Sequence, residues 1–291
     1  MSRRHRLSAA RTERQMLRSM QWTPHTAGEK RQSRSVSTQN VINSINSLLK
    51  NGVKEIVLTG VDLTSWGIDI FGKPSLGLLV KKILKNIPNL QRLRLSSIDP
   101  AEVDFDLMDA FEQENRLMPH IHLSIQHGDD IILKRMKRRH LYRDVINFVK
   151  EAKRRRNDIV FGGDFIAGFP TEDEKAHQKS MQLITEANIT YIHVFPYSNR
   201  KNTPASNMPQ VQKKIIQKRA KELRDLAEKQ HNKFLVSQIG TTQKVLVENN
   251  SVGHSTNFSK IKLKEHVEAC TIVSTKILEI NTHGLLGTIR N

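Results

Sequence analysis

The stretch His120–His140, HIHLSIQHGDDIILKRMKRRH, predicts a strand, a short polar turn and a basic helix. Polar residues alternate with Ile and Leu from 120 to 126, which is the period of a strand with one apolar face. Asp129 or Asp130 can then cap a helix beginning at 131. In α/β folds, ligands bind at such turns, at the C-terminal edge of the strands. The alternative is that Gln126 and His127 only satisfy backbone groups of the turn.

Strand and helix patterns alternate on both sides of this stretch. Short β-branched runs recur, and an amphipathic segment follows each of them. This alternation is typical of βαβ units with right-handed crossovers and a parallel sheet. The number of units predicts an α/β fold with a partial (β/α) barrel instead of a complete eight-fold one. The predicted strands are 54–60, 92–97, 120–126, 158–169 and 190–198, and the helices are 38–50, 75–86, 102–114, 142–155 and 172–188.

The pattern changes twice along the chain, which divides it into three segments. Residues 1–33 are rich in Arg and poor in periodic apolar residues, so we expect a disordered basic leader. Residues 34–236 hold the predicted barrel and end in a long basic helix at 211–236. Residues 237–291 show short alternating strands separated by glycines, typical of a small all-β, OB-like module that commonly binds nucleic acid.

The composition favours a nucleic-acid partner. The net charge is +18 and the isoelectric point is near 10.1, so polyphosphate binding with counterion release is expected. Residues 134–156 alone hold eleven Lys or Arg against two acids. A Lys-rich bias of the source genome is the alternative explanation.

Targeting signals are weak. No apolar run approaches the roughly 20 residues that a membrane-spanning helix needs, so we expect no membrane partner. The basic leader has no apolar core of a secretion signal, but its Arg- and Ser-rich composition leaves a mitochondrial presequence open. A cytoplasmic protein is the default expectation.

Cys270 is the single cysteine. One cysteine excludes an intrachain disulfide, and one thiolate cannot by itself hold a zinc or iron–sulfur centre.

Five motifs, taken together, resemble the radical S-adenosylmethionine methylthiotransferases. The branch that modifies N6-threonylcarbamoyladenosine in tRNA is the most similar, and the C-terminal module resembles the RNA-binding TRAM domain of those enzymes. The resemblance covers residues 33–291. In chain order the motifs are KEIVLTGVDLTSWG (54–67), LRLSSIDPAEV (93–103), HLSIQHGDDIILKRMKRRH (122–140), GGDFIAGFPTEDE (162–174) and HVFPYSNRKNTPA (193–205).

The resemblance implies radical chemistry on tRNA. In the family a [4Fe–4S] cluster on a CxxxCxxC loop cleaves S-adenosylmethionine, and a second cluster in an N-terminal domain supplies sulfur. The cofactors perform the radical step while the protein places them. The alternative for most of the binding residues named next is a purely structural role, since hydroxyl and amide groups at strand edges often have only that role. By motif position the resemblance assigns S-adenosylmethionine binding to Thr59, Gly60, Ser97, Gln126 and Asp164, with Arg139 for its carboxylate.

The chain departs from the family where the cluster loop should lie. Before the helix at 38 it reads QWTPHTAGEKRQSRS (21–35), without a cysteine, and no sulfur-donor domain precedes it. We therefore expect no [4Fe–4S] cluster here, no family reaction by this chain alone and a weakened case for S-adenosylmethionine binding. A frameshift or an alternative start in a decaying gene would explain the Arg-rich leader. The hypothesis requires that some frame of the upstream DNA encode CxxxCxxC.

Three functional hypotheses remain from the sequence. The chain is an inactive, truncated methylthiotransferase, or a non-catalytic tRNA- or RNA-binding protein, or a half-enzyme completed by a second polypeptide. Loss of the first barrel strand would expose a sheet edge, which a second polypeptide would have to cover.

Overall fold

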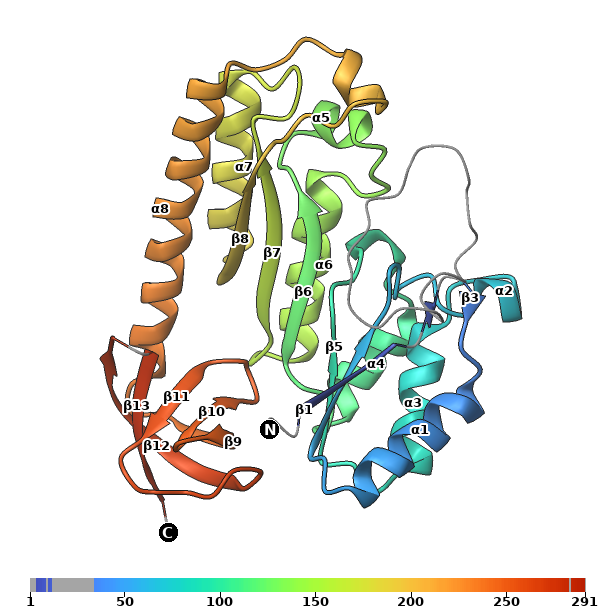
Figure 1. Ribbon diagram of the computed structural model, residues 1–291, viewed down its shortest axis with the longest axis vertical. Helices are drawn as coiled ribbons and strands as arrows, with labels where there is room; N and C mark the ends of the chain where they lie inside the picture. The colour runs from blue at the N-terminus through green and yellow to red at the C-terminus, as the bar shows by residue number, and fades with distance from the viewer. Residues whose placement is uncertain (1–3, 9, 12–33, 283, 291) are drawn as a thin grey trace.

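The computed structural model describes residues 4–8, 10–11, 34–282 and 284–290. Strands and helices alternate from β4 to β8, and a long helix then leads to a small C-terminal barrel (Figure 1).

A curved parallel sheet forms the larger part. One three-stranded sheet runs β1-β4-β5 and a second runs β6-β7-β8. Two parallel bridges, Leu93 to Leu117 and Ile98 to Leu123, connect the two sheets. The strands therefore follow one another in an incomplete barrel, and the predicted α/β partial barrel is confirmed. The strands are β1 (Arg4–Ser8), β4 (Glu55–Thr59), β5 (Arg92–Leu95), β6 (His120–Gln126), β7 (Val160–Ala167) and β8 (Tyr191–Pro196).

The helices connect these strands as expected. Predicted boundaries are close, with two exceptions. The short helix at 68–71 was not predicted, and a 3-10 turn, η2 (Pro100–Glu102), precedes α4, because Asp99 and Asp104 each cap a separate start. The connecting helices are α1 (Thr38–Lys50), α2 (Ile68–Phe71), α3 (Leu76–Asn86), α4 (Phe105–Gln113), α5 (Asp130–Arg135), α6 (Tyr142–Arg155) and α7 (Glu174–Glu186).

The first strand corrects one expectation. Arg4–Ser8 pairs in parallel with β4, from Arg4 opposite Glu55 to Ser8 opposite Thr59, and Leu7 is buried in the core. Farther along, β2 (Ala10–Arg11) pairs with β3 (Arg34–Ser35). The prediction of a wholly disordered leader is wrong for these residues, and so is the expected exposed edge at β4. The rest of the leader, residues 1–3, 9 and 12–33, lies outside the described residues.

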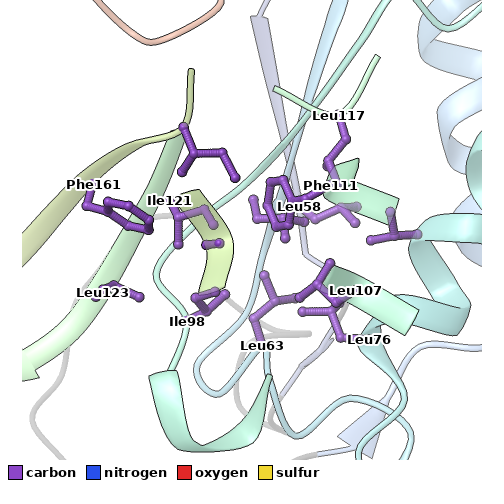
Figure 2. Packing of buried hydrophobic residues seen from close by; sticks show 14 of the residues in the cluster. Leu58, Leu63, Leu76, Ile98, Leu107, Phe111, Leu117, Ile121, Leu123 and Phe161 are labelled. Carbon is purple, nitrogen blue, oxygen red and sulfur yellow. The ribbon is translucent and has the colours of Figure 1, made fainter. Parts of the chain in front are cut away.

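The main core lies between the sheet and its helices (Figure 2). The cluster includes Leu58 of β4, Ile121 of β6, and Leu107 and Phe111 of α4. The approach of α3 to α4 is very close, since a Cβ on Gly77 would lie 2.1 Å from the backbone nitrogen of Leu107. The sequence pattern predicted correctly which faces of the helices and strands are apolar, because side chains repeat every 3.6 residues in a helix and every two residues in a strand.

The C-terminal part confirms the predicted β module. After the 3-10 turn η3 (Pro204–Asn207), helix α8 (Lys213–Gln238) runs beside β8 and ends at a closed five-stranded, TRAM-like barrel (Figure 1). Its strands follow the order β10-β11-β13-β12-β9. They are β9 (Thr242–Asn249), β10 (Val252–Ser255), β11 (Lys260–Leu263), β12 (Ile272–Asn281) and β13 (Gly284–Ile289).

A buried ion pair joins the two parts. Arg94 binds Glu55 through two hydrogen bonds of 3.0 and 3.3 Å, and it also donates to the carbonyls of Ser255 and Thr256 in the barrel. Phe258 stacks on His120 with ring centroids 4.8 Å apart. The barrel thus covers the N-terminal half of the sheet face and leaves the C-terminal half to the candidate site.

Among the described residues, no helix is both long enough and apolar enough to cross a membrane.

Candidate functional site

The C-terminal strand ends carry most of the predicted binding residues. Thr59 ends β4 with Gly60 next to it, Ser97 follows β5, and Gln126 ends β6. These strands are parallel neighbours, so their ends share one edge of the sheet. Thr59, Gly60 and Gln126 are half-buried and Ser97 is exposed. The side chains of Thr59 and Gln126 make no hydrogen bond to any residue that the structure describes, which leaves their polar groups available to a ligand.

Gln126 has a backbone that the sequence did not predict. Its φ is 68°, in the left-handed region, and the pairing of β6 with β7 shifts register between Leu123 and Gln126. A non-glycine residue held in this region is strained by roughly 1–3 kcal/mol. The turn therefore holds the backbone of Gln126 in a strained conformation. The alternating sequence pattern of 120–126 did not predict this conformation.

His127, the next residue, has a structural role. Its Nδ1 accepts the backbone N–H of Asp129, and its Nε2 lies 3.2 Å from Glu172. The same Glu172 accepts the N–H groups of Gly168 and Phe169 at 2.8 and 3.2 Å. This buried network fixes the turn after β6 against the turn after β7, as the structural alternative for His127 proposed.

Arg139 is already paired inside the chain. Its side chain is 58% exposed, forms an ion pair with Glu102 and lies 4.0 Å from Asp62. Arg138 is more deeply placed: burial lowers the pKa of its guanidinium, against the opposing fields of Asp99 and Asp164. Arg138 is half-buried and interacts electrostatically with these two carboxylates, and sequence reasoning did not distinguish it from Arg139 because both arginines occupy the same basic run.

Asp164 lies in a cluster with two histidines. It sits in the middle of β7, and its Oδ1 is 2.9 Å from Nε2 of His122 and 3.1 Å from Nδ1 of His193. Burial alone would raise the pKa of Asp164, but hydrogen bonds and the fields of both histidines lower it overall. Asp164 immediately precedes Phe165, the residue that pairs with Gln126, so the cluster lies next to the predicted strand edge. The polar alternation of 120–126 contained the signal for His122, and the fifth motif began with His193.

Most of the basic run at 134–156 is engaged within the chain. Arg154 and Arg155 bind Glu151, and Arg156 donates to carbonyls before β6, including that of Leu117 at 2.8 Å. The two pairs with Glu151 lie within α6, and the contacts of Arg156 hold the end of α6 against the segment before β6. The exposed cations of the run without a partner among the described residues are Lys134, Lys137, Arg143 and Lys150.

The donor set does not fit a [4Fe–4S] cluster. Such clusters need several thiolates, and this sequence has one cysteine. Cys270 lies in the C-terminal barrel, where its N–H bonds the carbonyl of Val247 just before β12. No step of a cluster reaction can therefore be assigned to the residues of this chain.

A partial parallel barrel with a polar strand edge and a C-terminal β-barrel defines a radical-SAM-type protein with a TRAM-like module. The family model "Radical SAM superfamily" matches residues 18–184, and this match begins inside the leader that we expected to be unrelated. The chain belongs to the radical SAM superfamily and, within it, to the methylthiotransferase family.

Curated relatives show the same relationship. The chain is 42% identical to the threonylcarbamoyladenosine tRNA methylthiotransferase MtaB of Rickettsia prowazekii, over 88% of this chain and 60% of that protein. It is 36% identical to a tRNA-2-methylthio-N(6)-dimethylallyladenosine synthase of Ehrlichia chaffeensis, over 92% of this chain and 62% of the relative. The chain therefore spans about 60% of the length of these relatives.

Among solved structures, coproporphyrinogen III oxidase (HemN) of Escherichia coli, a radical SAM enzyme, aligns with 66% of this chain and 46% of its own. The TM-score is 0.49 and the sequence identity is 12%.

Proposed function

We propose that this chain is a methylthiotransferase homologue that binds tRNA and does not carry out the radical reaction by itself. The observation that carries the proposal is the position of the single cysteine: Cys270 lies in the C-terminal barrel, and none lies near the strand edge. The relatives' names supply the partner, since both describe modification of tRNA. In this proposal the protein works in the cytoplasm, where tRNA is available.

The C-terminal barrel offers a surface for the RNA backbone. Along β11 and the residue that follows it, Ile261 and Leu263 are buried in the barrel and alternate with the exposed Lys260, Lys262 and Lys264. These three lysines make no ion pair with any described residue. Unpaired lysines in a row bind phosphates and release counterions, which makes the affinity depend on salt.

S-adenosylmethionine binding is the second element of the proposal. The polar groups at the strand edge that lack internal partners, Thr59 and Gln126, would contact the ligand together with Gly60 and Ser97. In this proposal Arg138 would bind the carboxylate instead of Arg139, because Glu102 already pairs with Arg139. When bound with a cluster, S-adenosylmethionine supplies radical chemistry; here these residues would only hold and orient it.

A salt titration of tRNA binding tests the main proposal. Replacing Lys260, Lys262 and Lys264 with Ala should weaken binding and reduce the slope of log K against log salt by about 0.7–0.9 per lost phosphate contact. The matched control replaces three exposed lysines on the helical side, Lys73, Lys82 and Lys85. Equal losses in both triple variants would show that binding reflects net charge alone.

The absence of radical chemistry has its own test. After anaerobic reconstitution with iron and sulfide, we expect neither [4Fe–4S] absorbance nor 5′-deoxyadenosine from S-adenosylmethionine. Formation of 5′-deoxyadenosine by the purified chain would refute the proposal. Formation only after a second polypeptide is added would support the half-enzyme instead.

A further inference from the structure

Three neighbouring strands each contribute one metal-binding side chain to a single point of the sheet. His122 comes from β6, Asp164 from β7 and His193 from β8, and their ligand atoms all lie within 4.8 Å of one another. We propose that these residues bind a divalent transition-metal ion. The site is separate from any iron–sulfur centre, because it contains no thiolate.

The local backbone is built to bring the groups together. Asp164 and His193 are directly opposite in the β7–β8 pairing, so their side chains share one face of the sheet. His122 is opposite Gly162, and a Cβ at that position would lie 2.5 Å from its Nδ1. The glycine therefore provides the room that the imidazole of His122 needs to reach Asp164 across the strand.

Strand alternation directs His122 away from the helical core. Its neighbours Ile121 and Leu123 are buried against the helices, while the His122 side chain keeps 12% of its surface exposed. The exposed fraction rises to 22% at Asp164 and 63% at His193. The trio thus forms a half-open site, shielded on one side and accessible to a solvated ion on the other.

The donor set selects the class of metal. Two imidazole nitrogens and one carboxylate oxygen suit Zn²⁺, Fe²⁺ or Co²⁺, whereas Mg²⁺ and Ca²⁺ prefer all-oxygen sites. Ligand bonds of roughly 2.0–2.2 Å place neighbouring donors about 3 Å apart. The two donor separations at Asp164, 2.9 and 3.1 Å, match this spacing. With three protein ligands, at least one position remains for water or another ligand.

Hydrogen bonding alone is the competing explanation. In that case both histidines would donate to Oδ1 of Asp164 and the trio would have no measurable preference for a metal. The two explanations differ in stoichiometry and in spectrum, which allows a direct test.

Titration of tag-free protein with Co²⁺ provides that test, read by visible absorbance and by metal content after gel filtration. We expect one equivalent with the d–d bands of a nitrogen and oxygen site. His193→Gln and Asp164→Asn should each weaken binding by more than about tenfold, since even supporting residues cost 10–100-fold. His266→Gln, at an exposed histidine of the C-terminal barrel, is the matched control and should bind like the wild type.

Folding is controlled with the same variants. His193 is largely exposed, so His193→Gln should keep the thermal unfolding midpoint of the wild type while losing the spectrum. The inference is overturned if His193→Gln binds Co²⁺ like the wild type, or if the wild type binds no stoichiometric metal. Neither outcome depends on tRNA binding, which is measured separately in metal-free buffer.

Discussion

Replacing Arg94 with Leu should separate the stability of the barrel interface from that of the two modules. Arg94 and Glu55 are almost completely buried, with 3% and 0% of their side-chain surfaces exposed. The guanidinium donates two hydrogen bonds to Glu55 and one each to the carbonyls of Ser255 and Thr256. The variant keeps apolar volume but leaves these acceptors without four donated bonds.

The magnitude follows from the burial. Removing one partner of a buried pair typically costs about 3–5 kcal/mol, because a charge stays in a medium that solvates it poorly. Arg92 lies 3.6 Å from Glu55 and compensates in part, so the lower half of that range is expected. A surface pair is different: Arg154 is 68% exposed beside Glu151, so its replacement with Leu should leave the stability of the protein nearly unchanged.

Urea unfolding followed by circular dichroism measures both variants. Arg94→Leu should lower the unfolding midpoint strongly and expose the segment around Ser237 to limited proteolysis, whereas Arg154→Leu should change neither. A loss below about 1 kcal/mol for Arg94→Leu would refute the reasoning, since it would mean that water solvates Glu55 in the folded protein.

Three further predictions concern local features. Gln126→Gly should raise the free energy of unfolding by up to about 1 kcal/mol, because glycine adopts the left-handed backbone conformation freely; a lower free energy of unfolding would contradict the strain at this residue. Burial raises the pKa of Asp129, but Lys179 and backbone amides lower it overall, so its stabilisation is complete above the unfolded pKa of about 3.9 and disappears as the pH falls through the lower folded value. Asp129→Asn should therefore flatten the acid side of a plot of stability against pH. An unchanged plot would show that the Asp129–Lys179 pair does not contribute to stability. Gly77→Ala should destabilise by about 1–3 kcal/mol because its Cβ would meet the backbone nitrogen of Leu107 at 2.1 Å, and thermal unfolding indistinguishable from the wild type would count against that packing.

Periodic features of the fold were predictable from the sequence. Apolar residues every two or every 3.6 positions placed β6, α3 and α6 within a few residues, because each face must pack against the core. The motifs likewise placed Thr59 and Gln126 at the strand edge. What the sequence could not give was side-chain pairing across strands. Arg139 and Arg138 look alike in the chain, and only the folded positions of Glu102 and Asp164 distinguish them.

The first strand was missed for a different reason. An edge strand that pairs on one side needs little from its sequence, because the pairing uses backbone groups that every residue except proline can provide. In Arg4–Ser8 the apolar contribution to the core is Leu7. A segment without family motifs can therefore still occupy the position beside β4, and its composition gave no periodic signal.

The same contrast explains how this fold can persist without the family's cluster. Strand pairing tolerates almost any side chain, so β1 can form from an Arg-rich segment. Cluster binding has no such tolerance, because it requires thiolates at defined positions, and the single thiol of this chain lies in the other module. Strand pairing therefore constrains the sequence much less than cluster binding does. The His122–Asp164–His193 cluster and the lysines at 260, 262 and 264 depend on specific side chains, and the experiments above can measure the function of both features.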